Sequence, residues 1–244
     1  MITKIDFDEN VVRRIVRAVA KAVTDDIPKY LYEHSKETNN AIGHLRGDYI
    51  NENLKAFALS EGIELLKFKR MSWQGIMLVD TKNKVSYSIT TQNTLSGIPK
   101  KKGRKKPHFL HSVLAIENKG YKPQSEQLTL FNMDEFTDEI LERDYSEIVS
   151  GLINPNEGYK HYVISYQAQH DEIIDIKLEF LDKNFNIIEQ ASLNEYLDLD
   201  FSKLTNVETF VETRPTPSSS EKVRGLVSVK PGLRPTLTEL EKQG

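Results

Sequence analysis

Short runs of alternating apolar and polar residues recur from residue 64 onward and limit the fold more than any other feature. In 85–91, Val85, Tyr87 and Ile89 share one phase, and serine and threonine fill the other. Successive side chains of a strand point to opposite faces, so this pattern predicts a strand with one buried face. Further strands are predicted at 64–70, 75–79, 109–116, 159–167, 172–181 and 185–190. Consecutive strands favour a mostly antiparallel sheet.

Turn sequences and burial patterns refine this prediction. The segments 80–83 and 182–184 are rich in Asp and Asn, whose side chains bond to turn backbone, and they predict two hairpins. The segment 109–116 is apolar on both faces, which is typical of a central strand.

Two helices are predicted before the strands. Residues 8–23 repeat Val, Ile and Ala at intervals of three and four, which indicates an amphipathic helix. Pro28 limits this helix, and the polar segment 33–47 is predicted to be a loop. Asp48 is a suitable N-cap for a second helix, which would end near Gly62.

A long acidic helix is predicted at 133–153, with Asn132 as its N-cap and Glu135 completing a capping box. We therefore expect an α+β fold, with a mostly antiparallel sheet packed against the N-terminal helices and this acidic helix. The domain would cover residues 1–204. Residues 205–244 are rich in Pro and Ser and predict a flexible tail, disordered by itself.

Composition excludes several classes of protein. The 244 residues contain no cysteine, which excludes disulfides, thiolate zinc sites, iron–sulfur clusters and a cysteine nucleophile. The net charge of −3 argues against a protein that coats nucleic acid with its whole surface. No apolar run approaches the length of a membrane span, and the acidic start MITKIDFDEN lacks a secretion segment. We therefore expect a cytoplasmic protein without membrane contact.

A strongly basic segment lies between two of the predicted strands. Six of its seven residues are cationic: Lys100, Lys101, Lys102, Arg104, Lys105 and Lys106. Such a cluster neutralises phosphates and predicts binding of nucleic acid backbone without sequence preference. Lys67, Lys69 and Arg70 extend this surface if their strand lies nearby. The alternative is a solvated loop whose charge the acidic helix balances.

A five-residue peptide supplies a second candidate for binding. Gln127, Leu128, Thr129, Leu130 and Phe131 resemble the pentapeptide by which many bacterial polymerases and repair proteins bind the DNA sliding clamp. That pattern runs Gln, Leu, a small or acidic residue, Leu, Phe. The resemblance implies the sliding clamp as partner, with the amide at the rim of a pocket and the apolar side chains inside it.

The same peptide also has a local structural interpretation. With Asn132 as N-cap, Phe131 and Phe136 stand where a hydrophobic staple places its two partners. In that case the peptide belongs to the protein's own architecture and is not free to bind.

The strongest catalytic alternative is a nuclease. Glu117 and Lys119 form a Glu-x-Lys triplet that resembles half of the motif of the restriction-endonuclease-like family. The resemblance implies that Asp80 and Glu117 hold Mg²⁺ and that Lys119 polarises the attacking water. The Asp175-x-Lys177 triplet is a rival of equal quality, and Asp80 also suits a turn.

These observations lead to one preferred function and two alternatives. We expect a non-catalytic accessory protein of DNA metabolism that docks on the sliding clamp, touches nucleic acid through the basic segment and needs no cofactor. The first alternative is the Mg²⁺-dependent nuclease. The second is a protein-interaction factor of phage-related or defence function whose tail, at 225–240, recruits a further protein. The whole chain resembles members of an uncharacterised bacterial and prophage-associated family.

Overall fold

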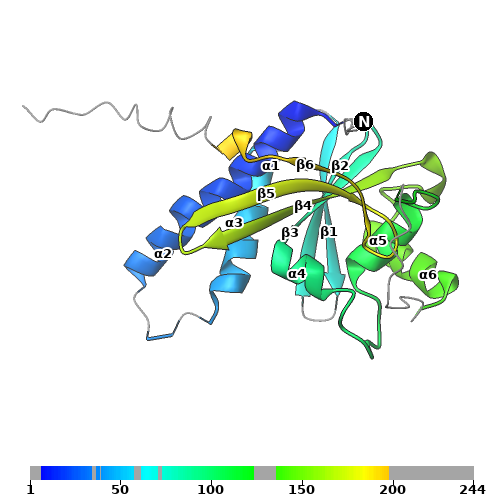
Figure 1. The fold of residues 1–244 in the computed structure, drawn as a ribbon, viewed down its shortest axis with the longest axis horizontal. Coiled ribbons are helices and arrows are strands. Elements are labelled where there is room, and N and C mark those ends of the chain that lie inside the picture. Colours follow the sequence, from blue (N-terminus) through cyan, green and yellow to red (C-terminus); the bar gives the residue numbers. More distant parts are fainter. Residues whose placement is uncertain are drawn as a thin grey trace, which may run out of the picture. The chain divides into compact units, whose positions relative to one another are not determined.

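The computed structural model describes residues 7–34, 37–38, 40–57, 62–70, 73–123 and 136–197. Within these residues the chain forms a six-stranded sheet with helices on both faces (Figure 1). This confirms the expected α+β fold. The tail predicted at 205–244 and the peptide at 127–131 lie outside the described residues.

The strands follow one another across the sheet in the order of the chain, from β1 at one edge to β6 at the other. Their bounds are β1 Ile63–Arg70, β2 Trp73–Asp80, β3 Val85–Thr91, β4 Lys160–Gln169, β5 Glu172–Leu181 and β6 Ile187–Ser192. All neighbouring strands are antiparallel except β3 and β4, which run parallel. The two predicted hairpin turns join β2 to β3 and β5 to β6. The sheet is therefore mostly antiparallel, as predicted.

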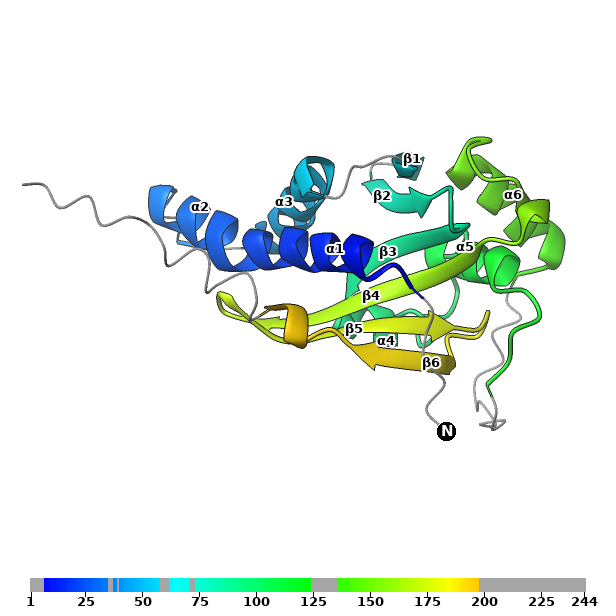
Figure 2. The same ribbon diagram turned by 90° about the horizontal axis from the view of Figure 1, so that it is seen from above.

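The contact between β2 and β3 is short. These strands pair at only three positions, Leu78 with Tyr87, Val79 with Ser86 and Asp80 with Val85. β2 pairs with β1 along its whole length, whereas β3 beyond Tyr87 pairs with β4 alone, as far as Thr91. The β1–β2 hairpin therefore diverges from the rest of the sheet (Figure 2).

The parallel pair requires a crossover, and this crossover contains α4 (Gln92–Gly97), α5 (Phe109–Glu117) and α6 (Asp138–Val149). A short 3₁₀ turn, η2 (Pro155–Glu157), precedes β4. The basic segment joins α4 to α5, so it is tethered at both ends. In both views α5 and α6 lie at the end of the molecule opposite to α2 (Figure 1, Figure 2).

The strand predicted at 109–116 is wrong, because this segment forms helix α5. Almost every α5 side chain is buried. A helix that is buried on all sides carries apolar residues on every face, so its sequence resembles that of a central strand. His108 caps its start, with Nδ1 3.3 Å from the Leu110 nitrogen. Full burial of Leu110, Val113 and Leu114 stabilises this packing by about 1.5–3 kcal/mol each.

The predicted start of the acidic helix is also wrong. Helix α6 begins at Asp138 after Thr137 and ends at Val149, where Ser150 adopts a left-handed conformation. Asn132 is therefore not its N-cap, and Phe136 precedes the helix instead of standing in its first turns. The staple geometry predicted from those positions does not apply to this helix.

The first helices are longer than predicted. Helix α1 (Glu9–Lys21) continues through a π-helical segment, η1 (Ala22–Asp26), into α2 (Ile27–Glu33). Pro28 stands in the first turn of α2, directly after the π-helical segment, and the helix continues past it, so it does not end the helix. Helix α3 (Ile42–Phe57) begins before Asp48, so residues 42–47 of the predicted loop are helical.

The sheet separates two apolar cores. Helices α1 and α3 cover one face, and α4, α5 and α6 cover the other. In β2, Leu78 belongs to the first core, whereas Met77 and Val79 belong to the second. No helix among the described residues has both the length and the apolar character needed to cross a membrane.

Candidate nucleic-acid interface

The basic segment lies over a groove between α6 and the β1–β2 hairpin. The five lysines are exposed, and Arg104 is half-buried. The groove has a volume of about 580 Å³, and its cationic lining residues are Lys69, Arg70, Lys101, Arg104, Lys105 and Lys106. Lys69 and Arg70 on β1 line the same groove as the basic segment, so their strand lies near enough to extend the basic surface.

Arg70 fixes the end of the basic segment. Its Nη1 and Nη2 atoms donate to the two carboxylate oxygens of Asp144 on α6, each at 2.8 Å. Nη2 also donates to the carbonyl oxygen of Pro107, again at 2.8 Å. The charge of Arg70 is thus neutralised by one acidic residue of α6, and its guanidinium ties three parts of the fold together. The acidic helix balances this one cation directly, while Lys69 extends the patch.

Trp73 forms an aromatic platform in the groove. Its side chain packs on Phe68 and Phe109, with ring centroids 5.6 Å away in both cases, yet Trp73 remains 45% exposed. Gly75 makes this arrangement possible, because a Cβ atom there would lie 2.6 Å from the Trp73 ring and 2.4 Å from the Phe68 ring. An exposed indole beside lysines is a surface on which a base can stack.

His108, which also lines the groove, has a neutral side chain. Burial, together with the nearby charges of Arg104 and Arg70, lowers the pKa of His108 to about 3. The imidazole is therefore uncharged at neutral pH. Its Nδ1 accepts from the backbone, which leaves the proton on Nε2.

A second cavity, of about 490 Å³, opens where β2 and β3 diverge. Trp73, His108 and Phe109 line both this cavity and the basic groove, so the platform is shared by the two. Tyr87 lines the cavity, is 1% exposed, and its hydroxyl has no hydrogen-bond partner among the described residues. Burial, with Asp80 next, raises the pKa of Tyr87, so the phenol stays neutral and can donate.

The three residues of the nuclease alternative have separate surroundings. The Asp80 carboxylate accepts from the Lys82 and Asn83 nitrogens at 3.1 and 3.0 Å and from the Asn83 side chain at 2.7 Å. These bonds stabilise the hairpin turn, which is the alternative role that the sequence allowed. Asp80 also follows Leu78 in the phase of β2 that faces α1 and α3.

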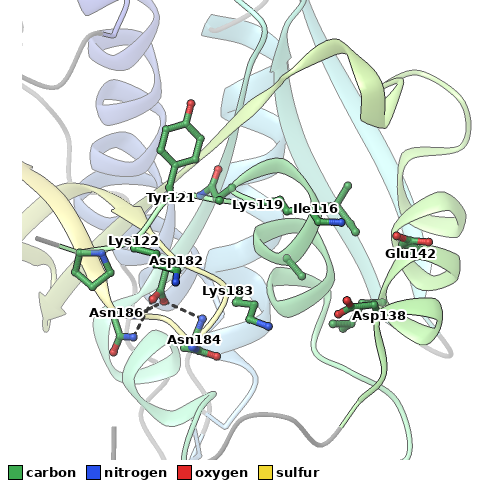
Figure 3. Close-up of a pocket in the computed structure, with 15 residues that line it drawn as sticks. Ile116, Lys119, Tyr121, Lys122, Asp138, Glu142, Asp182, Lys183, Asn184 and Asn186 are labelled. Atoms are coloured by element: carbon green, nitrogen blue, oxygen red, sulfur yellow. Dashed lines mark hydrogen bonds between the residues drawn. The ribbon is translucent and has the colours of Figure 1, made fainter. Parts of the chain in front are cut away.

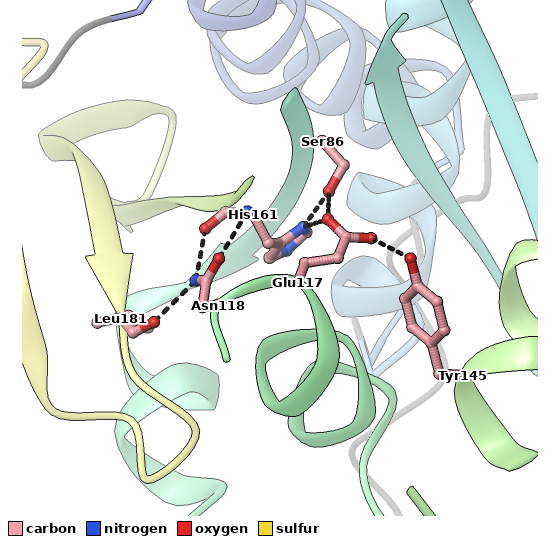
Figure 4. A network of polar contacts seen from close by, with 6 residues as sticks. All are labelled: Ser86, Glu117, Asn118, Tyr145, His161 and Leu181. Atoms are coloured by element: carbon pink, nitrogen blue, oxygen red, sulfur yellow. Dashed lines mark hydrogen bonds and ion pairs between the residues drawn. The ribbon is translucent and has the colours of Figure 1, made fainter. Parts of the chain in front are cut away.

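Glu117 ends α5 on the opposite side of the sheet, within a buried network (Figure 4). It accepts from Tyr145 at 2.9 Å and from Ser86, whose hydroxyl lies 2.6 Å from His161 Nδ1. Burial raises the pKa of Glu117 to about 7 and lowers that of His161 to about 3, so their proximity is not an ion pair at neutral pH.

This network is built for packing. Ser86 and Glu117 both approach the Nδ1 side of His161, whereas a hydrolytic triad contacts both ring nitrogens in turn. Ser86 and His161 are fully buried. The neighbouring Asn118 bridges strands, donating to the carbonyls of His161 and Leu181 at 2.9 and 2.8 Å (Figure 4).

Lys119 lies in the exposed turn after α5 and lines a third cavity of about 490 Å³ (Figure 3). Both Pro123 and Asp138 line this cavity as well, so the residues on either side of 124–135 meet at one site. In the rival triplet, Asp175 pairs with Lys177 at 2.9 Å and accepts from Gln92 at 2.8 Å. No group of three His, Asp or Glu side chains suited to a metal ion occurs within the described residues.

Sequence reasoning missed two residues of this surface. Trp73 was not singled out from the sequence, and Tyr87 was placed in the inward phase of a strand without a functional role. The signal for Trp73 was the Trp-x-Gly spacing, since Gly75 leaves room for the ring. For Tyr87 the sequence carries no signal, because its unpaired hydroxyl depends on where β2 and β3 separate.

Comparison with known proteins gives one match. The model of a family described as a family of unknown function (DUF5986) matches residues 4–243. No curated protein and no solved structure matches the chain.

Proposed function

The chain belongs to DUF5986, a family of unknown function, and we propose that it is a nucleic-acid-binding module that acts through its basic groove. The observation that carries this proposal is the joint lining of one groove by exposed lysines and the half-exposed Trp73. Lysines neutralise phosphates at any sequence, and an indole stacks on any base. Together they bind nucleic acid without reading its sequence.

The contacts of the groove support this interpretation over that of a solvated loop. A loop with no ligand needs no fixed position, whereas Arg70 donates one hydrogen bond to Pro107, directly after this segment, and is itself held by two hydrogen bonds to Asp144. The anchored end leads directly into His108 and Phe109, and the Phe109 ring packs against Trp73. The lysines are thereby held beside the aromatic platform.

The test measures, by fluorescence anisotropy, the binding of labelled single-stranded DNA, single-stranded RNA and duplex DNA, each about 20 nucleotides or base pairs long. A variant with Lys101→Glu, Lys105→Glu and Lys106→Glu is expected to lose at least about tenfold in affinity for whichever of these probes the wild type binds. The control carries the same charge change at the exposed Lys29, Lys55 and Lys183. Equal losses in both variants, or no binding by the wild type, would contradict the proposal.

We further propose that the sliding clamp is the partner that brings the module to DNA, through Gln127, Leu128, Leu130 and Phe131. The support is the agreement of all five residues with the clamp-binding pattern. Pro123 and Asp138, described residues on either side of this peptide in the sequence, line one cavity. Two weak contacts on one DNA-bound ring would act together through their high effective concentration.

Clamp binding is tested with the full chain and a purified bacterial sliding clamp by surface plasmon resonance. The double change Leu130→Ala and Phe131→Ala is expected to abolish binding. Thr129→Ala is the matched control, because the pattern accepts a small residue there. If the wild type does not bind, or if the double variant binds equally well, the clamp is not the partner.

A further inference from the structure

The exposed ring in the basic groove distinguishes a single strand from a duplex. Trp73 is 45% exposed, although its ring packs on Phe68 and Phe109. A nucleic acid covers this exposed surface by stacking a base on it. Inside a duplex both faces of every base are already covered by the neighbouring base pairs, so a base must first leave the stack. Trp73 therefore favours a strand whose bases are free.

The charges of the groove also favour one backbone over two. Its cations come from the basic segment and from β1, whereas the α6 residues that line it are Asp144, Glu147 and Ile148. The Asp144 carboxylate pairs with Arg70, and Glu147 is exposed. One phosphate backbone on the lysines is attracted, but a second backbone placed against α6 would meet the Glu147 carboxylate and be repelled.

We infer that the ligand of the basic groove is a single strand of nucleic acid, with one base stacked on Trp73 and the adjacent phosphates on the basic segment. The groove volume of about 580 Å³ falls within the range of sites that bury one small molecule, which suits a nucleotide and not a duplex. This inference rests on the proposed function and narrows it. Single-stranded DNA and RNA share the chemistry that the groove recognises.

Purely electrostatic binding predicts the opposite preference. A duplex carries two backbones, and each phosphate that a protein neutralises on it contributes more to counterion release than a phosphate on a single strand. Lysines acting alone would therefore bind the duplex more tightly. A preference for the single strand is the result that stacking on Trp73 predicts.

The test uses the full chain with four probes: a thymidine oligomer, a uridine oligomer, an abasic oligomer with the same number of phosphates, and a blunt duplex of the same length. Trp73 is the only tryptophan of the protein, so its fluorescence reports stacking directly. We expect the thymidine oligomer, the uridine oligomer or both to quench Trp73 and to bind at least about tenfold more tightly than the abasic oligomer and the duplex. Their relative affinity distinguishes DNA from RNA as the source of the strand.

Trp73→Leu keeps an apolar side chain against Phe68 and Phe109 but removes the surface for stacking. We expect this change to lower the affinity for the single strand by about tenfold, to the level of the abasic oligomer, which has no base to lose. Tyr121→Leu is the matched control. Tyr121 is also an exposed aromatic residue near a lysine, 40% exposed with its ring 5.6 Å from Lys160 Nζ, but it lines the third cavity. That change should leave every affinity as it is.

Each contrary result has a distinct meaning. If the duplex binds as tightly as the single strands, or if no single strand quenches Trp73, the inference is wrong while the proposed function stands. An equal loss in Trp73→Leu and Tyr121→Leu also overturns it. Quenching is measured on the wild type, so it decides the question even if Trp73→Leu does not fold. If none of the four probes binds, the proposed function fails together with this inference.

Discussion

Arg70 on β1 and Asp144 on α6 form a two-pronged ion pair with both N–O distances at 2.8 Å, and the same guanidinium bonds to Pro107. The side chains are only 16% and 9% exposed. A single residue of the edge hairpin thus connects the acidic helix to the end of the basic segment. The bond geometry requires the planar fork of arginine, which lysine does not supply.

Arg70→Lys is therefore expected to lower the free energy of unfolding by about 1–3 kcal/mol, measured by urea denaturation, because the two-pronged pair and the Pro107 bond are both lost. Arg13→Lys is the control, since Arg13 pairs with Glu9 on the exposed face of α1. That change should alter stability by less than about 0.5 kcal/mol. Equal effects at the two positions would show that Arg70 does not anchor the fold.

Gly75→Ala tests the platform. The new Cβ would lie 2.4 Å from Cζ of Phe68 and 2.6 Å from the Trp73 ring, so the indole must move away. We expect a loss of about 1–3 kcal/mol in stability and a red-shifted, more quenchable Trp73 emission. Gly97→Ala in α4 is the control, because a Cβ there meets open space. An unchanged emission spectrum in Gly75→Ala would mean that Gly75 does not set the position of the ring.

Glu117→Gln tests the buried network by its dependence on pH. The native pKa of about 7 lies above the ordinary value of 4.5, so the neutral carboxyl contributes stability below pH 4.5 that is lost as the pH rises through 7. His161 acts in the opposite direction, because its native pKa of about 3 lies below 6.5, and its stability is lost as the pH falls through that range. Both proteins contain His161, so their difference isolates Glu117.

The unfolding free energy of Glu117→Gln minus that of the wild type should therefore increase between pH 5 and pH 8, by roughly 2–3 kcal/mol. Chemical denaturation at several pH values measures it. Glu147→Gln on the exposed surface of α6 is the control and should show no such trend. A difference that stays constant with pH would mean that Glu117 titrates as it does in the unfolded chain.

Salt dependence distinguishes true phosphate contacts from general attraction. Each phosphate that a lysine neutralises contributes about 0.7 to the slope of log affinity against log salt for a single strand. Replacing Lys101, Lys105 and Lys106 by Ala should lower this slope by roughly 2, measured between about 50 and 200 mM salt. A loss of affinity with an unchanged slope would assign these lysines to folding instead of binding.

The strands were largely predictable from the sequence. The alternation in β1, β3 and β5 fixes which side chains turn inward, and Asp-rich turns mark both hairpins. Helix α5 was not predictable in the same way, because burial on all sides removes the contrast between faces that periodicity detects. The start of α6 was misplaced because Asn132 and Glu135 have the spacing of a capping box, whereas the helix begins after Thr137, whose side chain makes no capping hydrogen bond.

The site was predictable only in part. The density of lysines in 100–106 indicated the basic segment, since charge is visible without a fold. The junction of Trp73 with Phe109 and the unpaired hydroxyl of Tyr87 arise from a separation between neighbouring strands, which no local pattern encodes. Likewise, Ser86 and His161 meet Glu117 only through the parallel pairing of β3 with β4.

The turn between α4 and α5 belongs to the crossover between Thr91 and Lys160 and lies outside the paired strands. Strands β3 and β4 are paired directly, and the turn between α4 and α5 contributes no residue to the sheet. Doubling the length of such a turn costs only about 0.6 kcal/mol of closure entropy. The length and the charge of this turn can therefore change at little thermodynamic cost while β3 and β4 stay paired.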